Sequence, residues 1–217
     1  WRDMYASEYP RGVPYKNFLI TDPIRQQIPW KKQAIEAIRQ YRLPVWNAYN
    51  FSGTPLSGNI QAGVFYPLNI VFFALPFAHA WSLYIILQPL LAGLFFYAYV
   101  RSKKISKLAG IFGSLLFMFS GFSVSWLTWG NILHTHLWLP LMLMISDRLI
   151  ESEKKNNPFA YMFMLAIVLS MSIFAGHVQV FVYQLVFVLL YVVFQLYGKQ
   201  DFSKARMFIG SLCVFAV

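Results

Sequence analysis

The stretch Ala80–Val100 reads AWSLYIILQPLLAGLFFYAYV and contains no charged residue. A helix of about 20 apolar residues crosses the ~30 Å hydrocarbon core of a membrane, so this stretch is long enough to span one. In lipid no water is present to pair with free backbone N–H and C=O groups, which favours a helix over an open strand. The stretch therefore predicts a transmembrane helix.

Apolar runs of similar character continue to the end of the chain. Together they predict an all-α fold, a polytopic transmembrane helix bundle that occupies residues 79–217. Because Val217 lies inside an apolar run and the chain begins at Trp1, we expect the sequence to be a fragment of a longer protein. The expected spans are at about 80–100, 107–127, 134–150, 159–176, 178–197 and 207–217, the last one truncated.

The composition agrees with a membrane protein. Apolar residues make up 58% of the chain and charged residues only 12%, whereas soluble domains carry about 25% charged residues. The net charge of +10 would suit nucleic acid in a soluble protein. Here the basic residues lie between apolar runs of membrane-spanning length, so we expect contact with membrane lipids and no nucleic acid. The single cysteine, Cys213, excludes a disulfide within this stretch of chain.

The loops between the spans alternate in charge. The segments 101–107 and 199–206 are strongly basic, whereas 129–136 and 176–179 contain no Lys or Arg. Short loops rich in Lys and Arg stay in the cytoplasm. We therefore expect the basic loops inside the cell and the two histidine-bearing turns outside it.

Residues 1–59 differ from the rest, because they are polar, aromatic and rich in proline. We interpret them as a large extracytoplasmic first loop, since long loops cross the membrane largely regardless of their charge. Within it, residues from about 30 to 41 have apolar side chains at helical spacing, which predicts an amphipathic interfacial helix on the membrane surface. In residues 60–78 the apolar run 64–74 is too short for an easy span and is followed by Pro76, which favours a re-entrant or interfacial segment. A full crossing merged with the following helix is the alternative.

This topology places several polar residues on the outer face, at the mouth of the bundle. A carboxylate there can take a proton from a hydroxyl group, and Lys or Arg side chains can hold a phosphate. These residues therefore suggest a site that acts on a charged, membrane-bound substrate. They are Asp22, Arg25, Gln26, Gln27, His134, His136, His177 and Gln179.

Each candidate also has a structural interpretation. Asp22 comes immediately before a proline, as in the first turn of many helices, and could serve only as a helix cap. Lys31 and Lys32 could meet lipid head groups instead of a substrate. The Trp and Tyr residues of the loop could form an interfacial belt rather than a platform for a sugar. His134 and His136 do not share a helix face, which argues against a metal site.

A set of segments is more specific when taken together. They are TDPIRQQIPW (21–30), LPVWNAYNFSGTP (43–55), QAGVFYPLN (61–69), FSGF (119–122) and AGHVQ (175–179). With these segments the chain resembles the bacterial YfhO-like membrane proteins, which belong to the C-type superfamily of polyprenyl-phosphate-sugar-dependent glycosyltransferases. The resemblance covers nearly the whole chain.

The resemblance implies a multi-pass glycosyltransferase of the bacterial cytoplasmic membrane. Such an enzyme takes a sugar from a polyprenyl-phosphate carrier on the outer face and passes it to a hydroxyl of a glycan, polymer, lipid or protein acceptor. It implies Asp22 as the catalytic carboxylate. No second acid adjoins Asp22, so a divalent metal, which prefers several oxygen ligands, is not favoured, and no cofactor is expected. The residues expected to bind substrate are Arg25, Gln26, Lys31, Lys32, Trp46, Asn47, Tyr49, Asn50, His177 and Gln179.

Two other functions fit the same topology. A transporter or flippase for a lipid-linked or charged solute would carry ionisable groups near the membrane midplane, together with broken helices. Here the polar groups collect at one face instead. A non-catalytic scaffold or assembly subunit is the third interpretation. Purified protein given a labelled carrier-linked sugar would separate the three functions. A glycosyltransferase transfers the sugar, a transporter moves the carrier without changing a bond, and a scaffold does neither.

Overall fold

The structure is a computed structural model that describes residues 21–152, 158–199, 205, 208–210 and 212, and it is mostly helical. Most of the expected last span, 207–217, therefore lies outside the described residues. The elements are η2 (Pro23–Gln27), α1 (Ile28–Arg39), β1 (Trp46–Asn47), β2 (Thr54–Pro55), η3 (Ile60–Ala62), η4 (Pro67–Ile70), α2 (Val71–Ala74), α3 (Phe77–Ser102), α4 (Lys107–Met118), α5 (Gly121–Trp126), η5 (Leu127–Trp129), α6 (Ile132–His136), α7 (Leu139–Glu151), α8 (Pro158–Phe174) and α9 (Val178–Lys199).

Three helical segments of the described chain are long and apolar enough to cross a membrane. They are Phe77–Ser102, Lys107–Trp129 and Val178–Gly198. A shorter apolar helix, Pro158–Phe174, accompanies them. The chain is therefore a mostly helical membrane protein.

Two of the expected spans contain a break. The expected span at 134–150 is divided into α6 and α7, and the one at 107–127 into α4 and α5. At the second break the Ser120 side chain accepts a hydrogen bond from the Ser123 backbone N–H (3.3 Å), as in a helix N-cap. Ser123 Oγ in turn donates to Phe117 O (3.0 Å). These serines satisfy backbone groups that a break in a helix would otherwise leave free.

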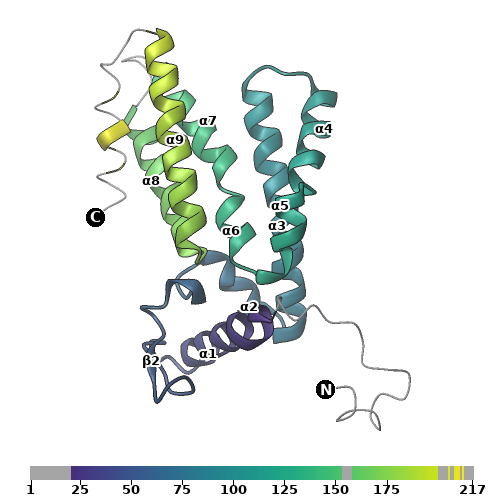
Figure 1. The fold of residues 1–217 in the computed structure, drawn as a ribbon, viewed down its shortest axis with the longest axis vertical. Helices are drawn as coiled ribbons and strands as arrows, with labels where there is room; N and C mark the ends of the chain where they lie inside the picture. The colour runs from purple at the N-terminus through teal and green to yellow at the C-terminus, as the bar shows by residue number, and fades with distance from the viewer. Residues whose placement is uncertain (1–20, 153–157, 200–204, 206–207, 211, 213–217) are drawn as a thin grey trace.

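Figure 1 shows the long helices running alongside one another, with α1 lying across one end of the bundle and the turn between α3 and α4 at the other end. We call these two ends the α1 end and the basic end. The basic end takes its name from Arg101, Lys103 and Lys104, which lie at this turn.

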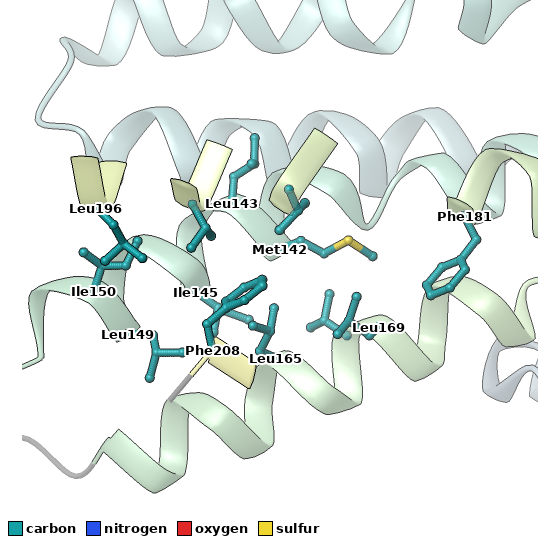
Figure 2. Close-up of a cluster of buried hydrophobic side chains, with 13 residues drawn as sticks. Met142, Leu143, Ile145, Leu149, Ile150, Leu165, Leu169, Phe181, Leu196 and Phe208 are labelled. Atoms are coloured by element: carbon teal, nitrogen blue, oxygen red, sulfur yellow. The ribbon is translucent and has the colours of Figure 1, made fainter. Parts of the chain in front are cut away.

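The largest apolar cluster joins α7, α8 and α9 (Figure 2). It includes Met142 and Leu149 of α7, Leu165 and Leu169 of α8, and Leu196 of α9. Lipid tails are as apolar as leucine, so such helices associate through van der Waals packing rather than through the exclusion of water. This cluster holds the second half of the bundle together.

A polar cluster ties α7 and α9 to the α3–α4 turn at the basic end. Asp147 in α7 is only 7% exposed, and its Oδ2 lies 2.6 Å from Nζ of Lys103. The Tyr191 hydroxyl of α9 donates to Asp147 Oδ1 (2.7 Å). A buried carboxylate that lacks a partner is strongly destabilising, so these contacts explain how an apolar helix accommodates Asp147.

At the α1 end, the apolar face of α1 packs against the protein. Ala34 and Ile35 are buried, and Ile35 shares an apolar cluster with Tyr66, Phe72 and Tyr84. The helical spacing in the sequence suggested a face that lies on the membrane surface. In the structure the protein covers Ala34 and Ile35 of this face and leaves Ile38 exposed, and α1 lies across the end of the bundle (Figure 1).

The segment after the β1–β2 hairpin forms the short helical turns η3, η4 and α2 at the α1 end and does not run along the bundle. Asn69 holds these turns together, because its Nδ2 donates to the carbonyl oxygens of Gly63 (2.7 Å) and Val64 (3.0 Å). Gly63 is left-handed, with φ of 55°, a conformation that glycine adopts without a steric penalty. The segment forms a support between α1 and the helix ends.

Candidate functional site

A groove of about 700 Å³ lies between α1 and the chain that follows it. One wall is formed by α1 residues from Pro29 to Ala37 and by Gln40 just after the helix, and the other by residues from Arg42 to Asn50 together with Leu56. Its volume falls within the ~300–1,000 Å³ of typical small-molecule sites. The groove is therefore large enough to hold a ligand.

The far wall of the groove is shaped by a tight hairpin. Trp46 pairs with Pro55 in the antiparallel β1–β2 ladder. The turn contains three successive left-handed residues, Phe51 (φ 49°), Ser52 (φ 66°) and Gly53 (φ 118°). For a residue other than glycine this conformation costs about 1–2 kcal/mol. Strain of this kind persists where the surrounding structure enforces it, and it clusters at functional sites.

Trp46 is the most distinctive side chain of the groove. It is 56% exposed, and a Cβ added at Gly53 would lie 2.4 Å from the edge of its indole ring. The backbone oxygen of Trp46 also accepts a hydrogen bond from Gln33 Nε2 of α1 (3.2 Å). Gln33 therefore joins the Trp46 backbone to α1, the indole ring packs closely against Gly53, and more than half of the residue remains open to solvent.

Several of the residues expected to bind substrate line this groove, but they do not all face a ligand. Lys32 and Tyr49 are exposed on its walls. Asn47 is buried, and its Oδ1 accepts a hydrogen bond from the Tyr49 backbone N–H (3.0 Å), so it shapes the loop. Asn50 is partly buried, and its backbone oxygen closes the turn by accepting from Gly53 N–H (2.7 Å).

The groove also contains residues that sequence reasoning did not single out. Glu36 lies one turn after Lys32, and their side chains form an exposed ion pair at 3.8 Å. Gln33, Gln40 and Arg42 complete the polar lining. The only signal for Glu36 in the sequence was the i,i+4 spacing from Lys32, which is common on any solvated helix.

Lys31 lies on a different side of α1 from Lys32. It is 5% exposed, and its Nζ donates to Asn69 Oδ1 (2.8 Å) and Gly63 O (3.1 Å). The same ammonium lies 5.4 Å from the centre of the Tyr84 ring. Burial lowers the pKa of Lys31 to about 7. Its contacts join α1 to the end of the bundle, and it does not line the groove.

Asp22 stands at the start of the helical segment that leads into α1. Its backbone is already helical (φ −58°, ψ −39°), and its side chain makes no capping hydrogen bond. The backbone N–H of Arg25 donates to Thr21 O (3.0 Å), which is the backbone hydrogen bond of a helical turn. Within the described part of the chain, the carboxylate of Asp22 has one hydrogen bond, from Gln26 Nε2 (3.3 Å). Asp22 is partly exposed and Arg25 exposed, and neither lines the groove.

His134 is buried inside the α1 end. Its Nε2 donates to Tyr84 O (3.0 Å), which leaves Nδ1 to accept from the Tyr66 hydroxyl (3.2 Å). Trp138 Nε1 donates to the same hydroxyl (3.2 Å). His136 is partly exposed, and its Nδ1 lies 3.3 Å from Gln184 Nε2, which also donates to His136 O (3.0 Å). These two histidines organise the interior and do not reach the groove.

Of the other expected pair, His177 lies at the turn before α9 and Gln179 lies in the first turn of α9. His177 Nδ1 accepts a hydrogen bond from the Val180 backbone N–H (3.2 Å), as a helix cap does. Burial lowers the pKa of His177. Gln179 is exposed and donates to the Tyr183 hydroxyl (2.7 Å). Neither residue lines the groove, so the structure does not gather all the expected site residues in one hollow.

Among the described residues, no three His, Cys, Asp or Glu side chains come together as a candidate metal site. The candidate site thus consists of the groove and, at the other end of the same helical segment, Asp22. The chain matches no known family model, no curated protein and no solved structure with which we compared it.

Proposed function

We propose that this chain is part of a membrane glycosyltransferase, which moves a sugar from a polyprenyl-phosphate carrier to a hydroxyl acceptor of the cell envelope. The proposal assigns the α1 end to the outer face of the bacterial cytoplasmic membrane. It does so because Arg101, Lys103, Lys104 and Lys107 lie at the opposite end, and short basic loops remain in the cytoplasm.

The observation that carries the proposal is the carboxylate of Asp22, which is partly exposed and makes no capping hydrogen bond within the described chain. This residue does not cap its helix, and Gln26 is its one hydrogen-bonding partner in the described chain. A partly exposed carboxylate can take a proton from an acceptor hydroxyl, which supports the proposed role of Asp22. Because the Asp22 side chain makes no capping hydrogen bond, helix capping does not explain the aspartate at this position.

In the proposed reaction the acceptor oxygen attacks the anomeric carbon of the carrier-linked sugar. The hydroxyl proton passes to the carboxylate of Asp22, and a bond forms between the acceptor oxygen and the anomeric carbon. The bond from that carbon to the phosphate oxygen breaks, and its electron pair leaves with the polyprenyl phosphate. Arg25, three residues after Asp22 and outside the groove, is the exposed cation proposed for this phosphate, and it stabilises the phosphate most as its charge develops.

The test is sugar transfer by the full-length protein in proteoliposomes that contain a labelled polyprenyl-phosphate sugar. Loss of a general base lowers turnover about 10²–10⁴-fold, so we expect this from Asp22→Asn. Glu151→Gln is the control, since Glu151 is an exposed carboxylate at the end of α7 that does not line the groove. Unchanged turnover in a folded Asp22→Asn protein would eliminate the role of Asp22. Loss of turnover in Glu36→Gln but not in Asp22→Asn would instead assign the general base to Glu36 in the groove.

A transporter or flippase is the second candidate, and a buried polar network favours it. Ser172 Oγ of α8 donates to Gln184 Oε1 of α9 (3.0 Å), and both residues are buried. Gln184 Nε2 donates to His136 O (3.0 Å). Polar groups inside a bundle mark many transport pathways. The same proteoliposomes distinguish this function, because a flippase moves the labelled carrier between leaflets without releasing its sugar.

A further inference from the structure

The groove is built almost apart from the membrane-spanning helices. All of its lining residues lie between Pro29 and Leu56, and none belongs to a helix that is long enough to cross the membrane. A polyprenyl carrier must keep its tail in lipid. A ligand that fills this groove therefore arrives from the aqueous side, which is the side of the acceptor.

The chemistry of the walls fits a sugar ring. Trp46 offers an exposed aromatic side chain that packs closely against Gly53. The amide side chains of Gln33 and Gln40 line the same groove. An amide both donates and accepts hydrogen bonds, as sugar hydroxyls do, and aromatic rings pack against the apolar faces of flat ligands.

We propose that this groove is the acceptor subsite of the enzyme, and that the acceptor is a saccharide chain with one sugar ring stacked on Trp46. The inference rests on the proposed function and adds to it the class of acceptor. The lining contains two cations, Lys32 and Arg42, and one anion, Glu36, so its net charge is about +1. This balance suits neutral or acidic sugars.

The position of Asp22 sets the size of this acceptor. The groove begins at Pro29, seven residues after Asp22, which is at most about 10 Å along the axis at the 1.5 Å per residue of an α-helix and less where Pro23–Gln27 form a π-helix. That distance exceeds the length of one sugar ring. A saccharide held by Trp46 must therefore contain several sugars to present a hydroxyl to Asp22, which excludes a free monosaccharide as the acceptor.

Binding tests the inference without any transfer reaction. The full-length protein in nanodiscs is titrated with neutral oligosaccharides (maltopentaose, chitopentaose) and an acidic oligogalacturonate, by calorimetry. We expect Trp46→Ala to weaken binding about tenfold or more. Gly53→Ala has the same effect, because its Cβ displaces the indole. Tyr41→Ala is the control, since Tyr41 is a fully exposed aromatic residue beside the groove that does not line it.

Three results would overturn the inference. They are no binding of any oligosaccharide of the panel, equal binding by Trp46→Ala, and quenching of Trp46 by brominated lipids. The last result, recognised by its loss in Trp46→Phe, would place the hairpin in the membrane.

Failure of the inference and of the proposed function can be told apart. If the wild type transfers sugar while Trp46→Ala keeps its KM for the acceptor, the inference fails and the proposed function stands. If oligosaccharides bind through Trp46 but no carrier-linked sugar is transferred, the proposed function fails. Agreement with both requires Trp46→Ala to raise the KM for the acceptor and to leave the KM for the donor unchanged.

Discussion

At the scale of single residues, Lys31 fastens α1 to the end of the bundle. Its Nζ lies within hydrogen-bonding distance of both Gly63 O and Asn69 Oδ1. Burial lowers the pKa of Lys31 to about 7, whereas an unfolded lysine titrates near ~10.4. Between these two pH values the unfolded chain binds more protons than the folded one. The contribution of Lys31 to stability therefore rises as the pH increases from about 7 to about 10.

We expect Lys31→Met to lower the free energy of unfolding by about 1–3 kcal/mol, because it leaves buried hydrogen-bond acceptors with fewer donors. The loss of stability is larger at pH 9 than at pH 6, because the contribution of Lys31 to stability rises as the pH increases from about 7 to about 10. Denaturation in mild detergent at the two pH values measures both effects. Lys32→Met, the exposed neighbour, changes stability by no more than about 0.5 kcal/mol. Equal losses for the two variants would contradict the structural role of Lys31.

At the scale of elements, the turn between α8 and α9 supports the segment that carries η3. Gly176 has φ of 107°, and a Cβ there would lie 2.8 Å from Ile60 O and 3.1 Å from Gln61 O. Asn131 Nδ2 donates to Gly176 O (3.3 Å). The atoms nearest to a Cβ at Gly176 are all backbone atoms, so no neighbouring side chain can make room for it by changing its rotamer.

We expect Gly176→Ala to lower the free energy of unfolding by at least about 2 kcal/mol, since both the φ value and the lack of space oppose a Cβ. Gly198→Ala in α9 is the matched control: nothing lies within 4 Å of its Cβ position, and alanine favours the helix by about 1 kcal/mol. Thermal unfolding of the two variants in the same detergent measures the difference. A Gly176→Ala protein as stable as the control would show that η3 does not depend on this contact.

At the scale of the whole molecule, the orientation in the membrane follows from charge. The proposed topology has the α1 end outside and the basic end inside. In a Cys213→Ser background, we expect Gly58→Cys to react with an impermeant maleimide in intact cells, and Lys104→Cys only after permeabilisation. Both positions are exposed in the structure. The reverse labelling pattern would refute the orientation and, with it, a reaction at the outer face.

Much of the helical framework was readable from the sequence, because apolar length is a local property. The run 80–100 lies within α3, which begins at Phe77 and ends at Ser102. The breaks within 107–127 and 134–150 were not anticipated. The first of them has a visible signal in the serine pair Ser120 and Ser123, which cap and bridge it.

The site depended on tertiary structure to a far greater degree. By itself the sequence determined that the chain is apolar, helical and asymmetric in charge, since these follow from composition and spacing. Only the folded chain decided that Lys31 is buried while Lys32 lines a groove, because neighbours on a helix point about 100° apart. Likewise, Trp46 meets Gln33 only because the hairpin returns alongside α1, and no local pattern encodes that return.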